Sequence, residues 1–139
     1  MLVLLDSNVF FSALIAPRGV PGRIVDAWLE QRFELITCPQ QINEIRQASR
    51  LPKFLPYFHP HDVGNLLNNI RRASVWEGTL PRKHQAADPA DSYLLDLMEA
   101  AQPDYAVTGD KRSGLLEIGN LGRTKILSAT VFSSRVLHL

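Results

Sequence analysis

The chain has 139 residues, of which 45% are hydrophobic and 21% are charged, and these values are typical of one soluble globular domain spanning residues 1–139. Its formal net charge of +1 gives no indication of a nucleic-acid partner, and its single cysteine excludes an intrachain disulfide and a cysteine metal cluster. No apolar run approaches the roughly 20 residues of a membrane span, so we expect a cytoplasmic protein without a membrane partner.

Apolar runs alternate with amphipathic segments along the chain. Residues 2–5 form a continuous apolar run, which indicates a strand buried on both faces. This alternation predicts an α/β fold, a three-layer α/β/α sandwich around a mostly parallel sheet of four or five strands. In chain order, the expected elements are a strand at 2–5, helices at 9–16 and 23–31, a strand at 33–37, helices at 39–49 and 61–72, a short strand at 73–76, a helix at 91–101, a strand at 105–107, a short helix at 113–118, a strand at 125–127 and a helix at 129–137.

Two acidic residues come directly after predicted strands. Asp6 follows the strand at 2–5, and Asp110 follows the strand at 105–107, separated from it by a Thr-Gly pair. In an open α/β sheet the ligand site lies beyond the carboxyl ends of the strands. If both strands are central and parallel, the two carboxylates therefore reach the same edge of the sheet.

Two further acids belong to predicted helices. Asp91 opens the helix at 91–101 and shares a face with its apolar residues, so we expect it to point toward the protein interior. Glu44 lies on the helix at 39–49, beside the centre of its apolar stripe. Taken singly, each of the four acids also has a local explanation, namely helix capping, a turn position or a solvated surface.

Taken together, three or four carboxylates at one end of a sheet are difficult to explain by local structure. They would repel one another and be costly to bury, and a divalent cation removes that cost. Mg²⁺ or Mn²⁺ prefers carboxylate oxygens and leaves positions for water and phosphate. One or two such ions can activate a water molecule, so the pattern indicates metal-dependent hydrolysis of phosphodiester bonds.

The charges are unevenly distributed along the chain. Residues 46–83 contain seven basic and two acidic residues, whereas the rest of the chain contains eight basic and twelve acidic ones. The segment is either a solvated surface or a basic surface beside the acidic centre that binds phosphate, and both interpretations stay open. Trp76 and Tyr93 stay open as stacking surfaces for a base, and His84 as a substrate contact.

The acids stand within recognisable local patterns. An apolar strand followed by Asp-Ser-Asn and an apolar helix opens the chain, and acid-bearing blocks follow it. The matching segments are residues 2–14, 33–45, 88–95, 107–111 and 126–132. In this order and spacing they resemble the PIN-domain family of metal-dependent ribonucleases over essentially the whole chain, and most of all the VapC-like toxins of toxin–antitoxin pairs.

The resemblance implies an acidic catalytic quartet. Its members would be Asp6, Glu44, Asp91 and Asp110. Asp6, Asp91 and Asp110 would be the ligands of Mg²⁺ or Mn²⁺, and Glu44 would hold a second ion or orient a metal-bound water molecule.

Other residues would assist this quartet. Ser7 and Asn8 would support Asp6 through hydrogen bonds, and Thr108 would support the site from behind the metal ligands. The basic residues predicted to bind the substrate are Arg46, Arg50 and Lys111.

The resulting prediction is a divalent-metal-dependent ribonuclease that hydrolyses RNA phosphodiester bonds. The resemblance further implies a toxin with a cognate antitoxin protein as partner, and a homodimer, which is common in the family. Two alternatives stay open, a catalytically silent PIN-like domain that binds RNA or protein, and an aspartyl-phosphate phosphatase. The latter usually needs a second Asp two positions after the first, where this chain has Asn8.

Overall fold

The computed structural model describes residues 1–86, 88–109 and 114–139 of the chain. None of the helices in these ranges combines the length and the apolar character that a membrane crossing requires. In chain order, the elements are β1 (Leu2–Leu5), α1 (Ser7–Ile15), α2 (Val20–Leu29), β2 (Glu34–Thr37), α3 (Pro39–Ala48), α4 (Pro60–Ile70), β3 (Ser74–Val75), the 3₁₀ helix η1 (Pro89–Asp91), α5 (Ser92–Ala101), β4 (Tyr105–Thr108), α6 (Leu115–Ile118), β5 (Asn120–Leu121), β6 (Thr124–Ser128), α7 (Ala129–Val131) and the π-helical turn η3 (Phe132–Val136).

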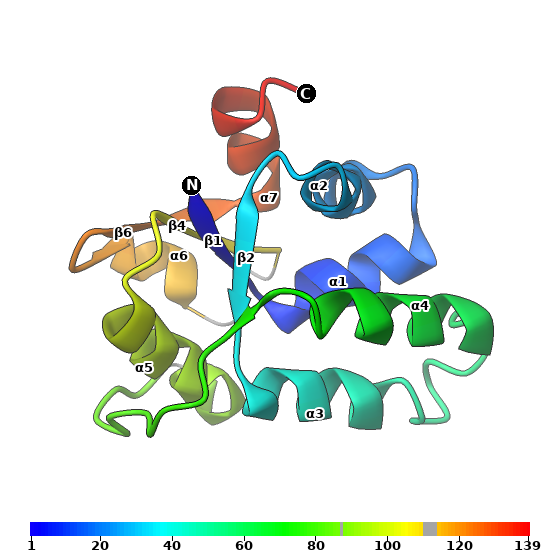
Figure 1. Cartoon of the computed structure of the whole chain (residues 1–139), viewed down its shortest axis with the longest axis horizontal. Helices are drawn as coiled ribbons and strands as arrows, with labels where there is room; N and C mark the ends of the chain where they lie inside the picture. Colours follow the sequence, from blue (N-terminus) through cyan, green and yellow to red (C-terminus); the bar gives the residue numbers. More distant parts are fainter. Residues whose placement is uncertain (87, 110–113) are drawn as a thin grey trace.

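The strands form one sheet in the order β3-β2-β1-β4-β6-β5 (Figure 1). β1 lies between β2 and β4 and is parallel to both, with Val3 opposite Leu35 and Tyr105. The predicted α/β class with a mostly parallel sheet is therefore confirmed. β5 is a strand that was not predicted; it pairs antiparallel with β6 because Gly122, with a φ of 57°, allows a tight return of the chain.

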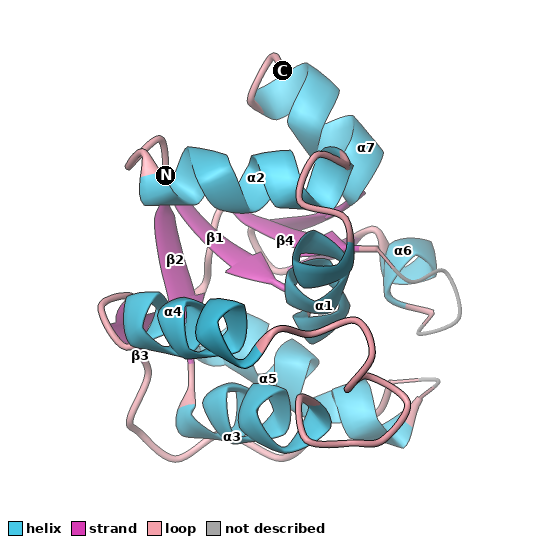
Figure 2. Cartoon of the chain, turned by 90° about the vertical axis from the view of Figure 1, so that its right-hand side faces the viewer, coloured by secondary structure: helices cyan, strands magenta, loops and turns pink. Residues whose placement is uncertain are grey.

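Helices cover both faces of the sheet, which gives the three predicted layers. Along β1, the side chains of Val3 and Leu5 enter one hydrophobic core and that of Leu4 enters the other. The first core is completed by α1, α2, α3, α4 and the C-terminal turn η3, and the second by α5 and α6. Figure 2 shows α1, α2 and α4 together on the near side of the strands.

Local signals explain where the helices begin. α1 begins earlier than expected because the Asp6 carboxylate caps it by accepting a hydrogen bond from the N–H of Asn8. α2 also begins earlier than expected, because Pro21 suits the first turn of a helix. The helix predicted at 129–137 is α7 followed by the wider turn η3. The capping of α1 also fixes the backbone around Asp6.

Candidate active site

Asp6 is the best-defined acid of the predicted quartet. It follows β1 directly, its side chain is 3% exposed, and its N–H donates to the carbonyl of Val107 on β4 at 2.9 Å. Its Oδ1 accepts a hydrogen bond from the N–H of Asn8 at 3.1 Å, and its Oδ2 accepts one from the hydroxyl of Thr108 at 2.9 Å. Both residues therefore hold the Asp6 carboxylate in place, Asn8 through its main chain.

A buried amide joins α3 to the end of β1, and sequence reasoning missed it. Gln41 is 0% exposed; its Nε2 donates to the carbonyl of Leu5 at 2.6 Å, and its Oε1 accepts from the hydroxyl of Thr37 at 2.6 Å. The Oγ of Ser7 lies 3.4 Å from the same Nε2. These contacts fix the first turn of α3, and Glu44 follows on the same side of the helix.

The hydroxyl of Tyr93 connects Glu44 to Ser7. It donates to Oε1 of Glu44 at 3.2 Å and lies 3.4 Å from the Oγ of Ser7. Tyr93 lies in the first turn of α5 and is 5% exposed. The start of α1, the middle of α3 and the start of α5 thus meet through three polar side chains.

The electrostatics of Glu44 reflect this crowding. Burial raises the pKa of the Glu44 carboxyl, the negative charges of Asp6 and Asp88 raise it further, and the hydroxyls of Ser7 and Tyr93 act in the opposite direction. Burial also raises the pKa of Tyr93, with the Glu44 charge adding to the effect, so the phenol stays a neutral donor. A bound cation would relieve the repulsion between these carboxylates.

Asp91 is the last residue of η1 and lies immediately before α5. Its side chain is 8% exposed, which agrees with the predicted inward orientation. The carboxylate of Asp88 caps η1 by accepting a hydrogen bond from the N–H of Ala90 at 3.0 Å. One short segment therefore buries Asp91 and brings Tyr93 to Glu44.

The donor chemistry of the acids fits a hard divalent cation. Asp6, Glu44 and Asp91 offer carboxylate oxygens, which Mg²⁺ and Mn²⁺ prefer. Within the described part of the chain, however, no group of three or more His, Cys, Asp or Glu side chains is arranged to hold a metal ion. Asp110 and Lys111, which were predicted as ligand and substrate contact, lie outside the described residues. The described acids thus supply only part of the predicted metal centre.

The structure does not bring Arg46 and Arg50 to the acids. Arg46 lies two positions after Glu44 in α3, so the two side chains leave the helix on different sides. Arg50 follows the end of α3 and is exposed. Among the described residues, neither arginine forms an ion pair with an acid. Their predicted contact with substrate therefore requires an RNA that extends along α3.

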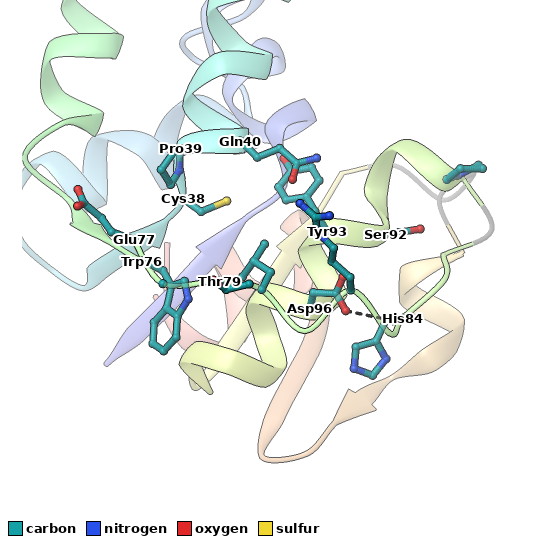
Figure 3. Close-up of a pocket in the computed structure, with 14 residues that line it drawn as sticks. Cys38, Pro39, Gln40, Trp76, Glu77, Thr79, His84, Ser92, Tyr93 and Asp96 are labelled. Carbon is teal, nitrogen blue, oxygen red and sulfur yellow. Dashed lines mark hydrogen bonds between the residues drawn. The ribbon is translucent and has the colours of Figure 1, made fainter.

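We call the described acids Asp6, Glu44 and Asp91 the acidic group. A pocket of about 630 Å³ adjoins it (Figure 3). It lies between the starts of α3 and α5 and the segment 76–84. Tyr93 belongs to both, because its ring lines the pocket while its hydroxyl contacts Glu44. Its lining also includes Cys38, Trp76, Glu77, Gly78, Arg82 and His84.

One wall of this pocket is attached to α5 by two acids. Asp96 is 4% exposed and accepts hydrogen bonds from the N–H groups of Lys83 and His84 at 3.2 and 3.0 Å. Glu99 pairs with the Nζ of Lys83 at 2.6 Å and with the Nε2 of His84 at 3.0 Å. Sequence reasoning missed Asp96 because it lies opposite the helix face formed by Asp91, Leu94, Leu95 and Met98, so the apolar pattern gives no signal of its buried partners.

Comparisons with known proteins identify the family of the chain. A family model described as PIN domain matches residues 2–112. An uncharacterized protein of Methanocaldococcus jannaschii is 42% identical over 110 residues, which is 78% of this chain and 70% of that protein. No solved structure gave a match. The relative has no assigned activity, so the narrower likeness to toxins stays a prediction. The chain belongs to the PIN domain family, whose members are typically nucleases and generally use divalent metals.

Proposed function

We propose that the protein is a divalent-metal-dependent ribonuclease that hydrolyses RNA phosphodiester bonds at the group formed by Asp6, Glu44, Asp91 and Asp110. One observation carries the proposal. The buried Asp6 carboxylate stands at the carboxyl end of β1, held by Thr108, and the next residue, Ser7, contacts the Tyr93 hydroxyl that donates to Glu44. Acids placed together at this edge of a parallel sheet suit a ligand site better than a structural role.

Each acid has a separate task in this proposal. Asp6, Asp91 and Asp110 would hold Mg²⁺ or Mn²⁺, and Glu44 would hold a second ion or orient water. A bound divalent cation supplies charge stabilisation at the phosphate and lowers the pKa of water. Thr108 keeps the Asp6 carboxylate in one orientation through its hydroxyl, as outer hydrogen bonds do in metal sites.

Glu44 is the residue best suited to move a proton. Its raised pKa brings the carboxylate closer to neutral pH, where a general base is most effective. Tyr93 holds its Oε1 through a hydrogen bond. In the reaction, a water oxygen would bond to phosphorus, the bond from phosphorus to the leaving nucleotide oxygen would break, and Glu44 would accept the proton of the water.

The basic segment 46–83 supports RNA as the substrate. It carries seven basic residues against two acidic ones, and such segments attract the phosphate backbone independently of sequence. Within the family, this charge pattern suits a polyanion better than a small phosphate ester. The role of toxin, the cognate antitoxin, the homodimer and the cytoplasmic location remain part of the proposal through the resemblance to VapC-like toxins.

The decisive experiment compares purified wild type with Asp6→Asn on labelled RNA in Mg²⁺ or Mn²⁺. We expect the substitution to lower cleavage at least about 100-fold, because a metal ligand loses its charge. Asp26→Asn, which changes an exposed acid on α2, is the matched control and should cleave normally. Equal cleavage by wild type and Asp6→Asn would rule out this site, and binding of metal without turnover of any RNA would favour a silent domain.

The two predicted protein partners can be tested separately. Light scattering after size-exclusion chromatography should give the mass of a dimer at micromolar concentration, and a monomer would contradict that part. Co-expression with the product of an adjacent reading frame should relieve any growth arrest that the chain causes, whereas Asp6→Asn should cause none. Growth arrest by both variants would contradict the role as a nuclease toxin.

A further inference from the structure

We propose that the pocket beside the acidic group binds one nucleotide of the RNA, with its base against Trp76 and its phosphate at Arg82. This inference rests on the proposed ribonuclease function, which it deepens by naming where the substrate is recognised. Four features of the described residues support it: the position of the pocket, its lining, the absence of an ion pair at Arg82 and the buried indole nitrogen of Trp76, for which no hydrogen bond is found.

The position of the pocket places a bound nucleotide next to the acids. Tyr93 is shared by the two sites, since its ring lines the pocket and its hydroxyl contacts Glu44 and Ser7. Cys38 lines the pocket at the start of α3, the helix that carries Glu44. A nucleotide in this pocket therefore lies one side chain away from the proposed reaction centre.

The lining suits a planar heterocycle. The volume of about 630 Å³ falls in the range of small-molecule sites. Figure 3 shows the indole of Trp76 and the ring of His84 on opposite sides of the pocket, with Tyr93 beside Gln40 near the start of α3. Aromatic side chains stack on bases of any sequence. The exposed carboxylate of Glu77, also in the lining, can accept a hydrogen bond from an amino group of the base.

Arg82 is the basic residue that remains available in this wall. Its neighbours Lys83 and His84 are both paired with Glu99, whereas Arg82 has no ion pair among the described residues and is exposed. Its backbone has a φ of 56°, a conformation that residues other than glycine rarely adopt and that surrounding contacts must hold. The hydrogen bonds that the N–H groups of Lys83 and His84 donate to Asp96 supply that support.

The indole nitrogen of Trp76 is a buried donor without a partner. Among the described residues, its Nε1 is the buried side-chain polar atom for which no hydrogen bond is found. Buried donors of this kind are rare. The residue beside it is Gly78, where a Cβ would lie 3.1 Å from Nε1. A carbonyl oxygen or ring nitrogen of a base would satisfy this donor after a small shift of the exposed segment 77–79.

The proposal is tested without cleavage. The protein is labelled with fluorotryptophan, which gives two ¹⁹F resonances because the chain has two tryptophans, and Trp76→Phe assigns them. Nucleoside monophosphates and dinucleotides are then titrated in EDTA. We expect the Trp76 resonance to shift and that of the core residue Trp28 to stay. If neither resonance moves, or both move alike, the pocket is not the binding site.

Arg82 is tested with a matched pair of arginine variants. Arg82→Gln should weaken binding of a nucleoside monophosphate about tenfold, because one charge-assisted contact is lost, and should bring its affinity near that of the uncharged nucleoside. Arg18→Gln, on the exposed turn before α2, should bind as wild type does. Equal affinity of both variants would overturn the assignment of Arg82 to the phosphate.

The two proposals can fail separately. In cleavage assays, Arg82→Gln should raise KM with little change in kcat. Cleavage that depends on Asp6 while the Trp76 resonance stays fixed would overturn the pocket alone. A shifted Trp76 resonance in a protein that cleaves no RNA would overturn the ribonuclease proposal and leave the nucleotide site standing.

Discussion

The acidic group and the pocket beside it are held by the chain in different ways. The acidic group joins β1, α3, α5 and β4 through buried or partly buried hydrogen bonds made by side chains. The far wall of the pocket is the segment 76–86, which contains no helix or strand among the described residues and is attached to α5 by Asp96 and Glu99. This contrast indicates a rigid place for the proposed reaction next to an adjustable place for the proposed binding of a nucleotide.

Removing the buried amide of Gln41 should have the largest effect, a loss of stability in the rigid region around the acidic group. Gln41→Leu leaves the carbonyl of Leu5 and the hydroxyl of Thr37 without their partner, and each unsatisfied buried group is costly. We expect the free energy of unfolding to fall by about 3 kcal/mol, with a melting temperature lower by about 10 °C. Urea and thermal unfolding measure both quantities.

The control for this variant lies on the same helix. Gln47→Leu changes an exposed amide of α3 and should alter stability by less than about 0.5 kcal/mol. If the two variants are equally stable, the amide at position 41 does not brace the site.

Asp96→Ala should release the pocket wall and spare the acidic group. Two main-chain N–H groups lose their acceptor, which costs about 2 kcal/mol. Hydrogen exchange should become faster at the amides of Lys83 and His84 and unchanged at the amide of Asp6. Faster exchange at all three amides would show that the two regions open together and would remove the contrast.

Thr108→Val tests the acidic group with a smaller change of shape. The valine fills the same volume but cannot donate to Oδ2 of Asp6. We expect a loss of about 1 kcal/mol in stability and a weaker affinity for Mn²⁺, measured by calorimetry. Unchanged metal affinity would mean that Thr108 does not orient the carboxylate.

The smallest expected effect comes from Glu44→Gln and depends on pH. The folded state raises the pKa of Glu44 above 4.5, so the wild type binds a proton more readily when folded. It therefore loses stability relative to the Gln variant as pH rises from the unfolded pKa through the raised one. In EDTA the variant should melt higher than wild type at pH 7, and the difference should vanish below pH 4. A constant difference across this range would contradict the raised pKa.

The succession of helices and strands could be predicted because each element follows from the pattern of its own residues. The apolar run at 2–5 and the stripes of the helices need no distant information. The order of the strands in the sheet could not be predicted, since β1 pairs with β4 across about a hundred residues of chain. β5 was missed because a two-residue strand gives no periodic signal.

The candidate site divides in the same way. Asp6 and Thr108 could be placed because each stands at the end of a predicted strand. The contact of Gln41 could not be predicted. An amide at the start of a helix has the same local pattern whether it is exposed or hydrogen-bonded to Leu5 on β1. For Arg46 and Arg50 the contact with substrate stays a prediction: charge content predicts a basic segment, but the face of α3 decides what each side chain can reach.

The single cysteine can report on the opening of the pocket wall. Cys38 is 2% exposed and lines the pocket, and burial raises the pKa of its thiol, with the charge of Glu44 adding to the effect. Only the thiolate attacks alkylating reagents, so the closed protein should react slowly at neutral pH. The rate of alkylation at Cys38 therefore measures how often the pocket wall opens, and this measurement needs no substrate, metal or engineered label.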